Sequence, residues 1–333
     1  MQNLILLWTL ESLKNWLMIK FWSYNREYKK YGNIFLKKIK KTLDKGTIFF
    51  GDQLNLFERN FVIKYKGKYG IAVRSGTDAL LISLKALNLK PRDEVITAAN
   101  TAIPTISAII NSGAKPKLVD IGEDYLIDAK KIEKQINSRT KAIIPVHLYG
   151  QACDMKKILK ISKKYKIPII EDCAQSQGAK FKNKFVGTFG TFGCFSFYPT
   201  KILGSYGDGG FILTDNFQLY KKIKRLRFYG IETEDRRNKY HGKYYANENG
   251  YNSRLDEIQA SILNLKFKKI DYLVKRRRQL VKIYTKNLRD TNLILPYENP
   301  NCRHVYHLFT IYHSKASKLI AKLKKLKIET RKI

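Results

Sequence analysis

The chain is short of acidic residues. Its 333 residues include 28 aspartates and glutamates against 64 lysines and arginines, so the formal net charge is +36. The basic residues are scattered along the sequence, and no helix-turn-helix, RRM or zinc-finger pattern accompanies them. We therefore expect lysine-rich helix faces in contact with solvent and no nucleic-acid partner. The charge also favours an anionic small ligand through long-range attraction.

Cysteine is scarce as well. The four cysteines, Cys153, Cys173, Cys194 and Cys302, lie far apart, with no CxxC pair and no cysteine–histidine cluster. This spacing excludes a disulfide framework and a structural zinc finger. We predict no metal site and a reduced, cytoplasmic compartment.

The sequence also lacks an uninterrupted hydrophobic run long enough to cross a membrane. Residues 4–22 are largely apolar, but Glu11, Lys14 and Lys20 interrupt them, and no small-residue cleavage site follows. We expect residues 1–21 to form an extension that holds an amphipathic helix, without a stable membrane span.

From residue 70 onward, helical and strand patterns alternate. Asp128 and Asp154 stand where helix N-caps are expected. Such alternation predicts an α/β fold, with a mostly parallel central sheet and helices on both faces. Ligands in such sheets bind at the carboxyl ends of the strands. The pattern predicts helices over 77–88, 103–111, 128–137 and 154–165, and strands over 94–97, 117–120, 141–148, 167–172 and 192–197.

Beyond residue 254 a long helical pattern runs to about residue 288, and Pro296 and Pro300 then interrupt it. A strand over 306–312 and a helix over 315–326 follow, which is too little to close an independent core. The predicted organisation is a large domain over 22–270 and a small, incomplete C-terminal α/β domain over 271–333.

A lysine and an aspartate follow or end two of these strands. The strand over 192–197 leads to Lys201, in a loop that closes with Gly207-Asp-Gly-Gly210, and the strand over 167–172 ends in Asp172. Pyridoxal phosphate (PLP) needs such a pair, because a lysine forms the Schiff base and an aspartate keeps the ring nitrogen protonated. Read alone, Lys201 is an ordinary surface lysine and Asp172 a helix-capping carboxylate, a part that Glu171 fills equally well.

A candidate phosphate site lies upstream. Ser75-Gly-Thr-Asp-Ala79 precedes a predicted helix, and the amides of Gly76 and Thr77 can hold a phosphate at its N-terminus. Ser196, on the approach to Lys201, offers a hydroxyl to the same phosphate. Read alone, the segment is an N-cap with a tight turn. The interpretation as a phosphate site therefore depends on the other segments.

Taken in order, these segments resemble the DegT-type sugar aminotransferases, PLP enzymes with the aspartate-aminotransferase fold (fold type I). The resemblance runs from about Trp22 to the last residue, and it implies an α/β PLP-transferase fold. The segments that carry it are Ser75-Gly-Thr-Asp-Ala-Leu80, Ile144-Pro-Val-His-Leu-Tyr-Gly150, Glu171-Asp-Cys-Ala-Gln175, Ser196-Phe-Tyr-Pro-Thr-Lys201, Gly207-Asp-Gly-Gly210 and Gly250-Tyr-Asn-Ser-Arg-Leu-Asp-Glu-Ile-Gln-Ala260.

The resemblance implies roles for individual residues. Lys201 is the lysine that binds PLP covalently, Asp172 pairs with the pyridine nitrogen, and Gln175 lies near the ring hydroxyl. For the phosphate group, the resemblance implies contacts from Gly76, Thr77, Ser196 and, in the neighbouring subunit's site, Asn252. A homodimer with shared active sites is therefore expected.

The implied reaction is transamination of a nucleotide-linked keto sugar, with glutamate as amino donor and 2-oxoglutarate as its product. Phe228-Tyr-Gly230, Tyr244-Tyr-Ala246 and Gly250-Tyr-Asn252 resemble enzymes that aminate dTDP-3-keto-6-deoxyhexoses for cell-surface polysaccharides or amino sugars. A PLP-dependent sugar dehydratase is an alternative, although such relatives replace the lysine that Lys201 retains. A truncated, inactive or regulatory family member is another.

Three positions depart from the family pattern. Ala102 stands where many relatives have an aromatic residue that stacks on the cofactor ring, and Gln177 where many have a histidine. After Lys327-Ile-Glu-Thr330, relatives continue with a His-Tyr-Pro-type loop and a closing helix, whereas this sequence ends at Ile333. We therefore expect a truncated small domain, and cofactor binding that is more robust than turnover.

Overall fold

The computed structural model describes residues 18–232 and 245–333. Most of the amphipathic helix expected in the N-terminal extension, and Tyr244 of the predicted subgroup motif, lie outside the described residues. Within the described range, no helix combines the length and the hydropathy that a membrane crossing requires.

The described end of the N-terminal extension is a strand-like segment, so the helix prediction is wrong for residues 18–21. Ile19 pairs in parallel with Ile328, close to the other end of the chain. Its N–H donates to the carbonyl of Lys327 at 2.8 Å, and the N–H of Glu329 donates to its carbonyl at 2.9 Å. This pairing satisfies backbone groups that a helix would otherwise bond internally.

The centre of the fold is a single layer of strands made by two hydrogen-bonded groups, β1-β9-β8-β5 and β3-β2-β4. Parallel bridges from Ile143 to Ile169 and from Val146 to Asp172 join β4 to β5. β9 runs antiparallel to β1 and β8, and the other pairs in the layer are parallel, which confirms the mostly parallel sheet. The strands are β1 (Tyr69–Val73), β2 (Glu94–Ala98), β3 (Lys115–Val119), β4 (Thr140–Ile144), β5 (Ile170–Asp172), β8 (Phe192–Ser196) and β9 (Gly210–Thr214).

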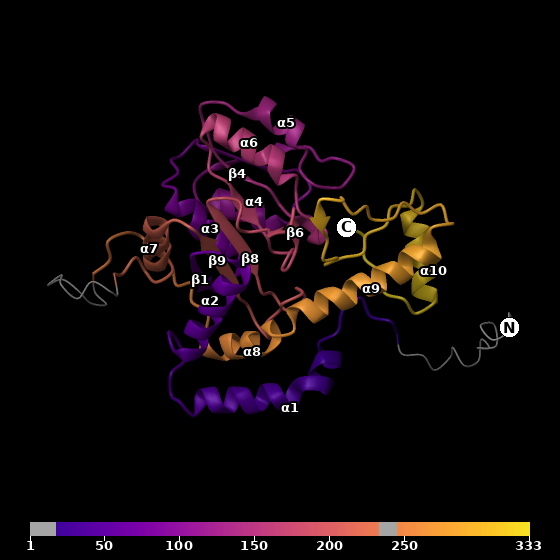
Figure 1. Cartoon of the computed structure of the whole chain (residues 1–333), viewed down its shortest axis with the longest axis horizontal. Helices are drawn as coiled ribbons and strands as arrows, with labels where there is room; N and C mark the ends of the chain where they lie inside the picture. Colours follow the sequence, from indigo (N-terminus) through magenta and orange to yellow (C-terminus); the bar gives the residue numbers. More distant parts are fainter. Residues whose placement is uncertain (1–17, 233–244) are drawn as a thin grey trace.

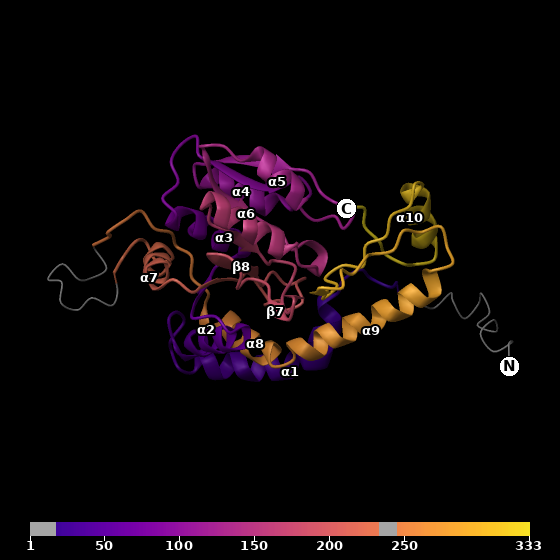
Figure 2. The same ribbon diagram turned by 45° about the horizontal axis from the view of Figure 1, so that its top comes forward.

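Helices cover both faces of this layer, as expected for the fold class. Successive side chains of a strand point to opposite faces. In β8 the ring of Phe195 packs on Phe61 of α2, with centroids 5.0 Å apart, while the thiol of Cys194 donates to the carbonyl of Ala79 in α3. α2 and α3 therefore lie on opposite faces, with α8 outside α2 and α1 outside α8 (Figures 1 and 2). The helices up to residue 267 are α1 (Tyr24–Leu43), α2 (Asp52–Tyr65), α3 (Gly76–Ala86), α4 (Ile103–Asn111), α5 (Ala129–Gln135), α6 (Met155–Tyr165), α7 (Phe217–Leu226) and α8 (Glu257–Phe267).

The predicted helix starts are confirmed in detail. The side chain of Asp128 accepts the N–H of Lys130, and that of Asp154 accepts the N–H of Lys157. Each aspartate thus satisfies an amide that has no partner inside its own helix.

The C-terminal part differs from the prediction in two places. A turn at Lys268–Lys269 divides the expected long helix into α8 and α9 (Ile270–Leu288), and α9 leads away from the sheet toward α10 (Ala316–Lys325; Figure 1). The strand expected over 306–312 is absent from the described structure, where only Tyr312 pairs, with Ile294. Nearby, a small antiparallel sheet joins β10 (Cys302–Arg303) to β6 (Lys180–Phe181) and β7 (Lys184–Phe185).

Arginine side chains explain why the strand over 306–312 does not form. Arg277 of α9 donates to the carbonyls of Tyr306 and His307, both at 3.1 Å. Arg278 donates to the carbonyl of His304 at 2.7 Å. Because these carbonyls are already satisfied by α9, the segment packs against the helix instead of pairing in a sheet.

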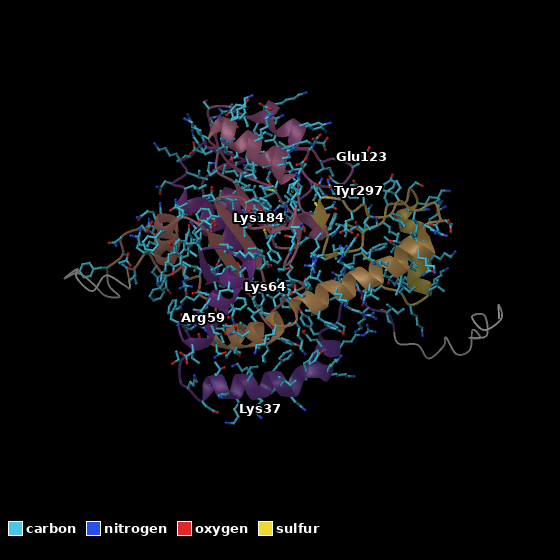
Figure 3. All side chains as sticks on the ribbon, in the orientation of Figure 1. Lys37, Arg59, Lys64, Glu123, Lys184 and Tyr297 are labelled. Carbon is cyan, nitrogen blue, oxygen red and sulfur yellow. The ribbon has the colours of Figure 1, made fainter. Side chains whose placement is uncertain are left out.

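The excess of basic residues is spread over the surface. Lys37 of α1, Lys64 of α2 and Lys184 of β7 lie on three separate elements (Figure 3). Their distribution fits the prediction of solvated lysine-rich faces, and it leaves a broadly positive exterior.

Candidate active site

Lys201 lies in a loop that is closed at its base. The loop leaves β8 and returns as β9. There, the N–H of Phe197 donates to the carbonyl of Gly209 at 2.7 Å, and the N–H of Ser205 donates to the carbonyl of Phe197 at 2.8 Å. A Cβ at Gly204 would lie 2.4 Å from the carbonyl oxygen of Pro199, so this close approach requires glycine. The crossing hydrogen bonds fix the path of the chain on both sides of Lys201.

The side chain of Lys201 is half-buried, and the acidic group that acts on its amine among the described residues is Asp172. Burial lowers the pKa of Lys201, and the negative charge of Asp172 opposes part of that decrease. Among the described residues, the amine makes no hydrogen bond or ion pair. An amine that is desolvated and left without a fixed partner is available as a nucleophile and a base.

Asp172 ends β5, pairs in register with Cys194 of β8, and is 5% exposed. Its Oδ1 accepts the N–H of Ala174 at 3.0 Å, and its Oδ2 accepts the hydroxyl of Thr105, in the first turn of α4, at 2.8 Å. Since the carboxyl ends of parallel strands meet at one edge, the sheet itself brings Asp172 and Lys201 together.

The predicted phosphate residues also come together. A Cβ at Gly76 would lie 2.5 Å from the Cβ of Ser196, so the N-terminus of α3 lies directly against the end of β8. The side chain of Ser75 caps the helix by accepting the N–H of Asp78 at 3.1 Å. The remaining first-turn amides, including that of Thr77, are oriented for an anion.

Gln177 supports the candidate phosphate site, formed by Gly76, Thr77 and Ser196, through the backbone of Ser196. Its amide nitrogen donates to the carbonyl of Ser196 at 2.5 Å, and its carbonyl oxygen is buried without a partner among the described residues. The glutamine therefore holds the backbone of Ser196 in place, a role that needs no titratable ring.

Gln175 is held with a defined orientation. Its Oε1 accepts the N–H of Tyr149 at 2.8 Å. Tyr149 has a left-handed backbone, with φ of 57°, which is uncommon for a bulky residue and marks a tightly constrained turn. Among the residues that the structure describes, the Nε2 of Gln175 donates to no partner, so its N–H groups can bind a ligand oxygen.

Asn252 is the one predicted residue that stands apart. It is exposed and forms an antiparallel bridge with Phe228. The next residue, Ser253, donates its hydroxyl to Asp78 of α3 at 2.7 Å. Among the described residues, no hydrogen bond joins the side chain of Asn252 to the other candidate residues.

Glu171, the alternative to Asp172, has a different task. It is fully buried and accepts the N–H groups of Gly187, Phe189 and Gly190, at 2.8, 2.7 and 2.8 Å. It also accepts the Nε2 proton of His147 at 3.0 Å. Glu171 therefore ties the loop before β8 to β5 and caps none of the described helices.

The same hydrogen bonds explain a cluster with metal-ligand composition, His147, Glu171 and Cys173. The Nδ1 of His147 accepts the N–H of Cys153 at 3.0 Å, so the ring proton is on Nε2. Burial raises the pKa of the Cys173 thiol well above its usual range. With both histidine nitrogens engaged, all four lone pairs of Glu171 used and the thiol protonated, the cluster acts as a structural brace.

Sequence reasoning missed two residues near the site. One is Thr105, whose hydroxyl holds Asp172. The other is His307, which is nine-tenths buried and whose Nδ1 has no hydrogen-bond partner in the part of the chain that the structure describes. Burial and the positive charges of Lys201 and Arg277 hold the pKa of His307 well below its usual range. Both residues lie far from Lys201 in the sequence, Thr105 before it and His307 after it. No sequence pattern links either of them to the site.

These features fit PLP. They supply a desolvated lysine, a carboxylate at the end of the neighbouring strand, and a glycine–serine cradle at a helix N-terminus. The sequence model of the DegT/DnrJ/EryC1/StrS aminotransferase family matches residues 30–333. The chain belongs to this family.

Relatives within the family are similar over most of the chain. The dTDP-3-amino-3,4,6-trideoxy-alpha-D-glucose transaminase of Micromonospora megalomicea subsp. nigra is 36% identical over 309 residues, 91% of this chain and 80% of the relative. The dTDP-3-amino-3,6-dideoxy-alpha-D-galactopyranose transaminase of Aneurinibacillus thermoaerophilus is 41% identical over 295 residues, covering 88% of this chain and 79% of its own length.

A solved structure agrees with this assignment. S. venezuelae DesV, determined in complex with a ketimine intermediate, matches with a TM-score of 0.88 at 33% identity, over 94% of this chain and 82% of DesV. The predictions of fold type I, of aminotransferase activity and of PLP as cofactor are thereby confirmed for this family member.

Proposed function

We propose that this aminotransferase transfers an amino group from glutamate to the keto group of a nucleotide-linked sugar, specifically a dTDP-3-keto-6-deoxyhexose. The amino sugar formed would serve cell-surface polysaccharide or amino-sugar synthesis. The observation that carries the proposal is the half-buried amine of Lys201, which interacts with the charge of the buried carboxylate of Asp172 at the edge of the sheet.

Each predicted residue has a physical task in this reaction. PLP, when bound, supplies a ring that accepts the electrons released at the substrate carbon. Lys201 would hold PLP through its amine, and that amine, when free, would carry the proton to and from the substrate carbon. Asp172 keeps the ring nitrogen charged, while Gly76, Thr77 and Ser196 bind the phosphate.

The remaining contacts complete this assignment. The free N–H groups of Gln175 bind the ring hydroxyl oxygen. We propose that residues 22–270 form the cofactor domain, and that the part from 271 onward covers the substrate. His307 and Arg277 of α9 support this second role because they approach the site from that part.

The choice of substrate is supported by the relatives and by charge. Both named relatives are transaminases of dTDP-linked 3-amino sugars. The positive exterior attracts a nucleotide diphosphate. The four cysteines are free thiols, three of them buried, which fits a reaction in the cytoplasm.

The test is an assay of the purified protein with PLP, glutamate and dTDP-3-keto-6-deoxyglucose. We expect 2-oxoglutarate and a dTDP-linked amino sugar in equal amounts, and no product with Lys201→Ala. The same assay with a UDP-linked 3-keto sugar compares the two nucleotides. Product from the UDP sugar alone would overturn the dTDP assignment, and sugar deoxygenation without 2-oxoglutarate would favour the dehydratase.

We also propose a homodimer in which Asn252 reaches the phosphate bound by the neighbouring subunit. Its exposed position in the single chain supports a contact outside that chain. Co-expression of Lys201→Ala with Asn252→Ala tests this idea. A shared site predicts mixed dimers with one native site and more activity than either variant alone, whereas independent sites predict no gain.

A further inference from the structure

The carboxylate of Asp172 is the end of a chain of hydroxyl groups. Thr105 is 1% exposed and donates to Oδ2 of Asp172 at 2.8 Å. The hydroxyl oxygen of Thr101 lies 2.8 Å from that of Thr105. Three oxygens from two elements, α4 with its preceding loop and the end of β5, therefore form one connected path.

The direction of this path follows from proton counting. A threonine hydroxyl carries a single proton, and an ionised carboxylate can only accept. Since Thr105 gives its proton to Asp172, the shared hydrogen bond between the hydroxyls must be donated by Thr101. Each donor in such a chain strengthens the next, because the first bond polarises the second.

The threonine side chain has no other task in the helix. The backbone N–H of Thr105 donates to the carbonyl of Ala102, and among the described residues its hydroxyl bonds only to Thr101 and Asp172. A helix built from isoleucine and alanine at its other buried positions would pack with an apolar residue here. The buried hydroxyl is therefore explained by the carboxylate that it contacts.

We propose that Thr105, supported by Thr101, is a positioning residue that sets how Asp172 shares a proton with the pyridine nitrogen of PLP. This inference rests on the proposed contact between Asp172 and that nitrogen. The hydroxyl orients the carboxylate and takes up part of its negative charge. Without it, Oδ2 becomes more basic and draws the shared proton away from the ring nitrogen.

The test reads the ring nitrogen directly, with PLP labelled with ¹⁵N at the pyridine position and bound to the full chain. In Thr105→Val we expect the ¹⁵N resonance to move toward that of unprotonated pyridine, and the dissociation constant of PLP to rise about tenfold. Thr105→Ser keeps the hydroxyl and should restore the wild-type resonance. Thr101→Val removes only the outer link and should give a smaller shift in the same direction.

A purely structural role predicts a different pattern. The unfolding midpoint would fall in Thr105→Val, while the resonance of bound PLP would stay at the wild-type position in all three variants, and that result overturns the proposal. If Thr105→Val does not fold, the half-buried Thr101→Val decides by the same criterion. Wild-type protein that binds no labelled PLP would instead refute the cofactor contact, which keeps the two failures distinct.

Discussion

Gly76 and Ser196 meet so closely that a Cβ on the glycine would lie 2.5 Å from the serine Cβ. Residues 120 positions apart in the sequence thus form the two sides of one cradle. A side chain at position 76 must push the start of α3 away from the end of β8, because neither backbone can yield without breaking the sheet or the cap at Ser75.

Gly76→Ala is therefore expected to weaken PLP binding at least tenfold, since overpacking of about 1–3 kcal/mol falls on the amides that we propose hold the phosphate. Titration of the variant with PLP, followed by visible absorbance, measures the effect. Gly122→Ala is the matched control, because its Cβ would meet only the carboxylate oxygen of Asp124, at 3.2 Å. If the two variants bound PLP with equal affinity, the proposed phosphate site at Gly76 and Ser196 would be contradicted.

Glu171 provides the second prediction, this time on stability. Glu171→Gln replaces one accepting oxygen with an NH₂ group that faces backbone N–H donors, at a site with no exposure. We expect a loss of roughly 3 kcal/mol or more in the free energy of unfolding, because hydrogen bonds to a buried charge are lost. Urea unfolding monitored by circular dichroism measures the change.

Glu133→Gln is the control for that experiment. Glu133 is exposed and pairs with Lys164 at the surface. Its substitution should leave the urea midpoint within experimental error, since exposed ion pairs contribute little. If the two substitutions shifted the urea midpoint equally, the hydrogen bonds of Glu171 would contribute no more to stability than the surface ion pair of Glu133.

The sequence predicts those residues of the candidate site that lie at the ends of strands. Lys201, Asp172 and Ser196 lie at or just beyond the ends of strands, and parallel strands bring their carboxyl ends to one edge whatever their order. Gly76 opens a helix after another strand, so the same rule brings it there. These residues were predictable because local patterns fix their places within the sheet.

Thr105 and His307 were not predictable in the same way. The hydroxyl of Thr105 reaches Asp172 because of how α4 packs over the sheet edge. His307 is held near the site by Arg277, in a segment whose alternating pattern indicated a strand. Side-chain hydrogen bonds across distant elements decided both positions, and periodicity carries no information about such bonds.

The loop that carries Lys201 provides a third prediction. The hydroxyl of Ser205 lies 2.8 Å from the carbonyl of Phe197 and 2.6 Å from that of Gly207. Ser205→Ala should loosen the loop and lower the rate at which Lys201 bonds to added PLP, measured as growth of visible absorbance. Ser261→Ala removes a buried hydroxyl that bonds within α8 and should leave that rate unchanged. A slower rate in both would point to general destabilisation.

The last prediction concerns acid. Burial lowers the pKa of His304 to about 4 from its usual 6.5, with the positive charge of Arg278 acting in the same direction and Glu298 opposing it. The Nδ1 of His304 accepts the N–H of Tyr306 at 2.9 Å. If Nδ1 were protonated, its N–H and that of Tyr306 would point at each other and the hydrogen bond would be lost. The neutral form is therefore the one that the fold accommodates.

The sign of the effect follows from proton binding. Between pH 6.5 and pH 4 the unfolded chain binds a proton at His304 that the folded chain does not, so stability rises with pH across this window. The full stability is present above pH 6.5, and about 2 kcal/mol is lost on going from pH 7 to pH 5. His304→Gln retains an oxygen that can accept from Tyr306 but does not titrate. Thermal unfolding at pH 7 and pH 5 should show a smaller fall in Tm for His304→Gln than for the wild type, and equal falls would mean that His304 titrates alike in both states.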